Sequence, residues 1–186
     1  MSILGAVTIP LPRSRPLTRA DLDAMPDDGH RYELIDGVLV VTPAPSPGHQ
    51  IVAGNLYSLL RAACPAELRV LFAPVDVAIS DDTVMQPDLL IAARSDFTRR
   101  DLPKAPLLAV EILSPSTRRF DLMLKRSRYE AAGCASYWVV DPDAPSLLAC
   151  ELRDGAYLEV ANVSGDEVFH ATLPFAVEVR PADLTL

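Results

Sequence analysis

A single acidic side chain interrupts the apolar stretch LLAVEILSPS, which runs from Leu107 to Ser116. The rest of this stretch is typical of a strand that is buried on both faces. Because side chains alternate along a strand, Glu111 shares one face with Ala109 and Leu113. An ionised carboxylate in an aliphatic layer is unfavourable unless a partner compensates its charge. The stretch therefore predicts a cation or a metal ion beside Glu111.

A second acidic residue opens an earlier apolar run, MQPDLLIAA. Asp88 follows Pro87 there, and we expect it at the start of a strand, where active-site clefts commonly lie. Two carboxylates on adjacent strands offer the hard oxygen ligands that Mg²⁺ and Mn²⁺ prefer, and the backbone carbonyl of Ile112 is a third candidate ligand. A turn residue at the strand start is an equally good explanation of Asp88 taken by itself, because Pro-Asp is a weak signal.

The helix expected at residues 118–133 supplies a basic side chain near Glu111. Lys125 lies four residues after Asp121 and on the same side of the helix as Tyr129, so it can fold back over the sheet and meet Glu111. A solvated lysine is the alternative, because other basic residues of the helix occupy its other faces.

Apolar periodicity indicates the elements that must position these residues. Asp36-Gly37 separates two β-rich runs and predicts a hairpin over residues 31–41. Residues 49–64 repeat apolar side chains at helical spacing and predict a core-facing helix. The order of elements favours an α/β or α+β core. A short helix is expected from Thr18 to Pro26, the last helix is expected to be capped by Ser116 or Thr117, and strands are expected at 68–72, 75–79, 87–93, 107–113, 136–141, 146–152, 156–160 and 175–179.

Length and composition indicate one globular domain. The chain has 186 residues, of which 49% are apolar and 23% are charged. We expect residues 1–17 to form an irregular arm and residues 18–186 to form a single domain. No apolar run has the length of a membrane span and no basic segment precedes the apolar start, so a cytoplasmic location is expected. The three cysteines are far apart and are expected to be reduced, structural thiols: Cys64, Cys134 and Cys150.

Charge is segregated along the chain. The net charge is -8, which taken alone argues against a nucleic-acid partner. The segment from Arg94 to Arg128, however, holds nine basic residues against four acidic ones, a net charge of +5, so the remainder carries -13. The basic segment surrounds Glu111 and could neutralise phosphate groups without reading sequence.

Three segments together resemble a known family. They are YELIDGVLVVTPAPSPGHQ at residues 32–50, PD at 87–88, and VEILSPSTRRFDLMLKRSRYEAAGCASYWVVDP at 110–142. These segments resemble the Uma family of bacterial restriction endonucleases, in the PD-(D/E)xK nuclease superfamily, and the resemblance extends from about His30 to Asp183. It implies an α/β, restriction-endonuclease-like fold with a central mixed β-sheet flanked by helices and an N-terminal β-hairpin.

The resemblance also implies roles for individual residues. The lysine that the superfamily carries two positions after the acid is replaced here by Leu113, and Lys125 matches the migrated lysine of the family. The implied activity is Mg²⁺-dependent or Mn²⁺-dependent hydrolysis of DNA phosphodiester bonds, with a homodimer cutting the duplex. The implied catalytic set is Asp88, Glu111 and Lys125 with Glu33 as an additional acid, the implied metal ligands are Asp88, Glu111 and Ile112, and the candidate nucleic-acid contacts are Arg118, Arg119 and Arg128.

Other interpretations of the same residues stay open. Glu111 and Lys125 could form a purely structural ion pair, and Glu33 is as readily a cross-strand partner of a basic side chain as a functional acid. His49 is left outside the core set, because a residue at the start of a helix commonly serves the cap. A nuclease-derived module with little or no activity, which binds nucleic acid or protein, is the alternative function. A hydrolase acting on another phosphoester is a third.

Overall fold

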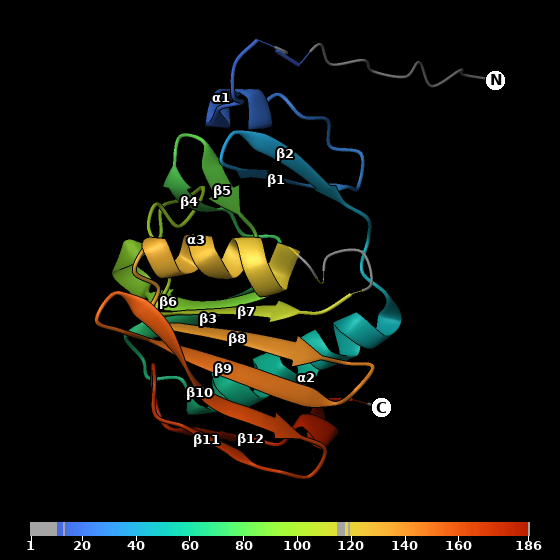
Figure 1. Ribbon diagram of the computed structural model, residues 1–186, viewed down its shortest axis with the longest axis vertical. Coiled ribbons are helices and arrows are strands. Elements are labelled where there is room, and N and C mark those ends of the chain that lie inside the picture. Colours follow the sequence, from blue (N-terminus) through green and yellow to red (C-terminus); the bar gives the residue numbers. More distant parts are fainter. Residues whose placement is uncertain (1–10, 13, 115–117, 119, 186) are drawn as a thin grey trace, which may run out of the picture.

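The structure, a computed structural model, describes residues 11–12, 14–114, 118 and 120–185. Its described strands form a larger sheet of six strands, a smaller sheet of four strands and a separate pair of strands near the C-terminus, with helices on both sides of the larger sheet (Figure 1). The helices are α1 (Arg19–Leu22), α2 (Pro47–Ala63), the 3-10 turn η1 (Arg94–Asp96), the π-helix η2 (Phe120–Lys125), α3 (Arg126–Ala131) and the 3-10 turn η3 (Pro181–Leu184). The strands are β1 (Arg31–Ile35), β2 (Val38–Thr42), β3 (Leu68–Phe72), β4 (Val77–Ser80), β5 (Thr83–Met85), β6 (Leu89–Ala93), β7 (Leu108–Ile112), β8 (Ser136–Asp141), β9 (Ser146–Arg153), β10 (Ala156–Ser164), β11 (Phe169–Ala171) and β12 (Val177–Val179).

The larger sheet is mixed and has six strands in the order β10-β9-β8-β7-β6-β3. Only β7 and β8 run parallel, and they are joined by the segment that carries η2 and α3, since a parallel pair needs a crossover connection. All residues of β7 and β8 are buried, as continuous apolar runs in central strands should be. These features confirm the predicted central mixed sheet flanked by helices.

The smaller sheet has four strands in the order β2-β1-β5-β4 and contains the predicted hairpin. Asp36 and Gly37 form its turn with φ values of 53° and 72°, as a two-residue primed turn requires. The chain leaves this sheet after β5 and enters the larger sheet at β6 only a few residues later, so the segment 86–88 joins the two sheets.

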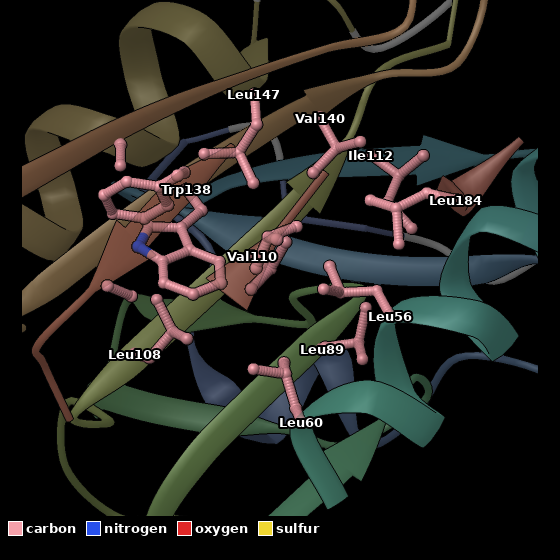
Figure 2. Packing of buried hydrophobic residues seen from close by; sticks show 14 of the residues in the cluster. Leu56, Leu60, Leu89, Leu108, Val110, Ile112, Trp138, Val140, Leu147 and Leu184 are labelled. Carbon is pink, nitrogen blue, oxygen red and sulfur yellow. The ribbon is translucent and has the colours of Figure 1, made fainter. Parts of the chain in front are cut away.

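One face of the larger sheet packs against α2. Ser46 caps this helix by accepting a hydrogen bond from the His49 N–H, and Pro47 occupies its first turn. Leu56 and Leu60 lie against the strands, where Val110 and Trp138 fill the centre of the layer (Figure 2). This apolar face fixes the position of α2 and, with it, of His49.

The opposite face packs against α3 and the smaller sheet. The buried apolar side chains on this face form a second hydrophobic cluster, called the second cluster below. It includes Ala109, Leu113 and Tyr129, together with Ile35 of β1. Glu111 shares the face of Ala109 and Leu113, as the alternation of the strand predicts. The acid therefore points toward the smaller sheet and α3 and away from α2.

The structure departs from the sequence expectations in a few places. Strands β5 and β11 were not expected, because each has three residues and too short a pattern to recognise. The expected last helix is partly a π-helix, in which hydrogen bonds close over five residues. Ser116 and Thr117, the expected caps, and Arg119 lie outside the described residues. No helix in the described part of the chain is long and apolar enough to cross a membrane.

The hairpin turn supports a stability prediction. A Cβ on Gly37 would lie 2.4 Å from the Pro16 Cβ, whereas a Cβ on Gly155, which also has a positive φ, would meet nothing within 4 Å. We expect Gly155→Ala to lower the free energy of unfolding by about 1 kcal/mol, from the left-handed backbone alone. Gly37→Ala should cost about 1–3 kcal/mol more, because it adds a steric clash. Urea unfolding checks both variants, and equal losses would contradict the contact with Pro16.

Candidate active site

Three carboxylates from neighbouring strands converge between the two sheets. Glu33 lies on β1, Asp88 directly precedes β6, and Glu111 lies on β7. The β6–β7 register pairs Leu89 with Val110, so Asp88 and Glu111 come next as cross-strand neighbours on one face. The predicted placement of the two acids on adjacent central strands is therefore confirmed.

Lys125 places its ammonium group between two of these carboxylates. Its Nζ lies 2.9 Å from Glu33 Oε1 and 3.2 Å from Glu111 Oε1. The side chain is buried at the junction of η2 and α3, where the helix faces the second cluster. The structure thus brings Lys125 to Glu111, and it also brings Glu33 into the same ion-pair group. The interpretation of Lys125 as a solvated helix lysine is wrong.

Asp88 is held by three donors from three different elements. Arg31 lies 3.0 Å from Oδ1, His49 Nε2 lies 3.1 Å from Oδ2, and the Ile112 N–H donates to Oδ2 at 2.8 Å. Burial opposes ionisation of Asp88, but His49, Arg31 and the Ile112 N–H outweigh it and hold the pKa of that carboxyl below its usual range. Asp88 is therefore an anion at neutral pH in spite of its burial.

The charge of the group is not balanced by its permanent cations. The carboxylates of Glu33, Asp88 and Glu111 lie with two permanent cations, the buried Lys125 and the half-buried Arg31. The group therefore holds one carboxylate more than it holds permanent cations, in a region of low dielectric constant. Such an excess favours the binding of a further cation or of a proton.

The residue types suit a divalent metal ion. Carboxylate oxygens and a backbone carbonyl are hard ligands for Mg²⁺ or Mn²⁺, and Glu33 Oε2 is buried without a hydrogen-bond partner among the described residues. The described arrangement is nevertheless one in which protein donors occupy the acids. Within the described ranges, no three His, Cys, Asp or Glu side chains are grouped so as to hold a metal ion. The predicted ligands Asp88, Glu111 and Ile112 stay a prediction.

Several residues of the site were not predicted as part of it. Arg31 shares a face of β1 with Glu33, a relation that strand alternation alone could have shown. Gln86 donates its backbone N–H to Glu33 Oε1 at 2.7 Å. His49, left outside the core set, contacts Asp88 because α2 begins beside β6. No sequence signal identifies this contact, since it joins residues 39 apart through tertiary packing.

Tyr129 closes the group on the side of α3. It is fully buried, and its hydroxyl has no hydrogen-bond partner among the residues that the structure describes. Burial, together with the charges of Glu111 and Glu33, raises the pKa of Tyr129 well above its usual range. The phenol therefore stays protonated and presents an O–H group, not a further charge, to the acids.

A cavity of about 570 Å³ lies beside the site and is lined by Arg31 and Gln86. Among its described lining residues Arg31 is the one permanent cation, while Asp23, Asp27 and Asp76 contribute acids. Glu33, Glu111 and Lys125 are not part of this lining and are no more than 2% exposed.

The predicted nucleic-acid contacts are engaged within the protein. Arg118 pairs with Asp141 at 2.7 Å and Arg128 pairs with Asp36 at 2.5 Å. Arg119 lies outside the described residues. Contact of these arginines with nucleic acid stays a prediction, and any such contact would compete with the ion pairs.

The three cysteines are not among the predicted site residues. Cys64, Cys134 and Cys150 are free thiols, as expected. Burial raises the pKa of Cys134 to about 11, which keeps this thiol protonated and unreactive at neutral pH.

Comparison with known proteins identifies the family and the fold of the chain. The sequence profile of the Uma2 family, described as "Putative restriction endonuclease", matches residues 19–185. The chain belongs to this family. A crystal structure of "a putative nuclease belonging to DUF820 from Anabaena variabilis ATCC 29413" is similar with a TM-score of 0.73 and 19% identity, covering 91% of this chain and 97% of that one. None of the curated proteins compared with the chain is significantly similar in sequence. The likeness of the Uma2-family chain to that structure confirms the restriction-endonuclease-like fold.

The buried lysine supports a prediction on stability and pH. Lys125→Met leaves two buried carboxylates without their shared cation, and we expect it to lower the free energy of unfolding by about 3–5 kcal/mol at pH 8. Protonation of the carboxylates removes the uncompensated charge, so the loss should shrink as the pH falls toward 5.

Lys104→Met is the matched control for this experiment. Lys104 is exposed and pairs with Asp96, so its replacement should cost less than about 1 kcal/mol. Urea unfolding at both pH values measures these losses. A loss for Lys125→Met that equals the control, or that grows with acidification, would contradict the buried ion-pair group.

Proposed function

We propose that this protein is a metal-dependent DNA endonuclease that hydrolyses phosphodiester bonds. The observation that carries the proposal is the convergence of Asp88, Glu111 and Lys125, with Glu33, in one buried group. Membership of the Uma2 family supports a nuclease-like function at the level of the family. Metal dependence, the choice of DNA as substrate and a cytoplasmic location are parts of the proposal.

Phosphodiester hydrolysis needs a deprotonated water, stabilisation of the charge on the phosphorane-like transition state, and a route for the leaving oxygen. Mg²⁺ or Mn²⁺ held by Asp88, Glu111 and the Ile112 carbonyl would supply Lewis-acid stabilisation of phosphate oxygens and lower the pKa of bound water. Arg31 and His49 keep Asp88 ionised and fix its orientation.

In the proposed reaction the Lys125 ammonium stabilises the negative charge that develops in the transition state. The ammonium is held by Glu33 on one side and by Glu111 on the other, so its position is defined by two strands. An ammonium in a buried site stabilises developing negative charge more strongly than one in water. Glu33 holds this ammonium and, through the Gln86 N–H, is itself tied to the segment that carries Asp88.

We propose in addition that two copies act together on a DNA duplex. A single group of this kind cuts one strand at a time, and the two strands of a duplex run in opposite directions, so a two-fold symmetric dimer matches their symmetry. Sedimentation of the protein with and without duplex DNA measures this association.

A catalytically silent module is the second candidate. The specific observation in its favour is that both oxygens of Asp88 are already taken by protein donors. In such a module Arg31 and Lys125 would replace the metal ion permanently, and the ion-pair group would serve stability alone. The two functions differ in their response to metal ions.

Replacement of the acids tests the activity. Asp88→Asn and Glu111→Gln keep side-chain shape but remove an anionic ligand, and we expect each to reduce metal-dependent nicking of supercoiled plasmid by at least about a hundredfold. Glu178→Gln is the matched control, because Glu178 is exposed on β12, and it should nick at the wild-type rate. Nicking that survives in rigorously purified Asp88→Asn protein would overturn the proposal.

Metal binding is tested independently of activity. Because the buried group holds more carboxylates than permanent cations, Mn²⁺ or Mg²⁺ should raise the melting temperature of the wild-type protein, since a ligand that binds only the folded state stabilises it. Glu111→Gln should melt at the same temperature with and without the ion. Identical shifts in the two proteins, or no shift in the wild type, would favour the silent module.

A further inference from the structure

A second cavity, of about 460 Å³, is rich in arginine. Its lining includes Arg69, Arg94, Arg99 and Arg100 and one acid, Asp101. Four guanidinium groups gather here in a chain whose net charge is -8. A concentration of positive charge against the sign of the whole molecule favours an anionic ligand.

The acid of this cavity is already neutralised. Asp101 is buried, pairs with Arg19 and accepts a hydrogen bond of 2.6 Å from the Thr98 hydroxyl. Burial raises the pKa of Asp101, but the Thr98 and Arg19 donors and the nearby charges of Arg19 and Arg100 lower it by more. The ion-pair partner of Asp101 lies outside the four arginines, which outnumber this one acid in the lining.

Two of the four arginines have internal partners and two do not. Arg94 donates to the Ala66 carbonyl at 3.2 Å, and Arg100 pairs with Asp23. Within the part of the chain that the structure describes, no ion pair or side-chain hydrogen bond engages Arg69 or Arg99. Their planar donors can therefore take a phosphate at no cost in existing contacts.

Apolar side chains complete the wall of the cavity. Leu71, Val75 and Phe97 are half-buried and pack against the second cluster, the same cluster that underlies the active site. An apolar wall beside arginines strengthens their attraction for an anion, because it lowers the local dielectric constant. It also offers contact area to a deoxyribose.

The cavity lies on the catalytic face of the larger sheet. Strand β3 pairs with β6 so that Arg69 is opposite Ala92 and Leu71 is opposite Leu90. Cross-strand partners share a face, and Ala92, Leu90 and Asp88 alternate along the same one. Arg94, at the far end of β6, is six residues from Asp88, or about 20 Å at about 3.3 Å per residue.

We propose that this arginine cavity binds a backbone phosphate of DNA at a distance from the bond that is cut. The inference rests on the proposed function and adds a second phosphate site to it. A separation of about 20 Å equals the rise of about six base pairs along the axis of a duplex. The cavity binds DNA without reading its sequence, since guanidinium groups that meet phosphates carry no base information.

Salt-dependent binding tests the site without cleavage. Fluorescence anisotropy with a labelled DNA duplex of about 30 base pairs, in EDTA and between about 50 and 200 mM salt, measures the affinity and its salt slope. Removing the two arginines that hold this one phosphate, in the double variant Arg69→Ala/Arg99→Ala, should reduce the slope of log K against log salt by about 0.9. The affinity at about 100 mM salt should fall by at least about tenfold.

Arg153→Ala is the matched control. Arg153 is an exposed arginine that pairs with Glu151 at the β9–β10 turn, away from the cavity, and its replacement removes one positive charge. It should leave both the affinity and the slope at wild-type values. Thermal melts will check that each variant is folded. We expect melting temperatures close to that of the wild type, because these arginines lie on the surface of the cavity.

The outcomes separate the cavity from the active site. An unchanged slope in the double variant, an equal loss in Arg153→Ala, or no binding of the duplex by the wild type would overturn the phosphate site. Weakened binding in the double variant, in a protein that nicks no plasmid with any divalent ion, would leave the phosphate site standing and reject the endonuclease. Nicking by the wild type with an unchanged slope in the double variant would do the reverse.

Discussion

The ammonium of Lys125 between Glu33 and Glu111 is the interaction on which the site depends. It joins the smaller sheet, the larger sheet and the last helix through one buried cation. Loss of this shared cation would be costly, because it removes an ion-pair partner from two buried carboxylates at once. The same contact gives the site its chemistry, since a cation fixed beside two acids is prepared to meet a phosphate.

The short path between the two sheets explains why these groups meet. Residues 86–88 connect β5 to β6, so the Gln86 N–H reaches Glu33 while Asp88 reaches the Ile112 N–H. This three-residue segment therefore hydrogen-bonds to Glu33 of the smaller sheet and to Ile112 of the larger sheet. Arg31 and His49 then approach Asp88 from β1 and α2. The result is a buried group of acids, with Arg31 also lining the cavity beside it.

Charge is distributed in the fold differently from its distribution along the chain. The basic segment from Arg94 to Arg128 was expected to surround Glu111, and three of its arginines, Arg118, Arg119 and Arg128, were expected to contact DNA. In the fold Arg118 is paired with Asp141 and Arg128 with Asp36, while Arg119 lies outside the described residues. Other members of the segment, with Arg69 of β3, gather at the opposite end of β6. Segregation of charge was therefore visible in the sequence, but its place on the surface was not.

Local patterns were sufficient for the longer elements and for two of the acids. Strand alternation placed Glu111 on a buried face, continuous apolar runs identified the central strands, and Asp36-Gly37 specified the hairpin, because each of these depends on neighbours a few residues apart. Helical spacing allowed Lys125 to meet Glu111, and the resemblance added its catalytic role and Glu33. The contacts of Asp88 with Arg31 and His49 were decided only by tertiary packing, since they join residues 57 and 39 apart whose separation in space no local rule sets. The three-residue strands and the arginine cavity depend likewise on how the sheets and loops pack together.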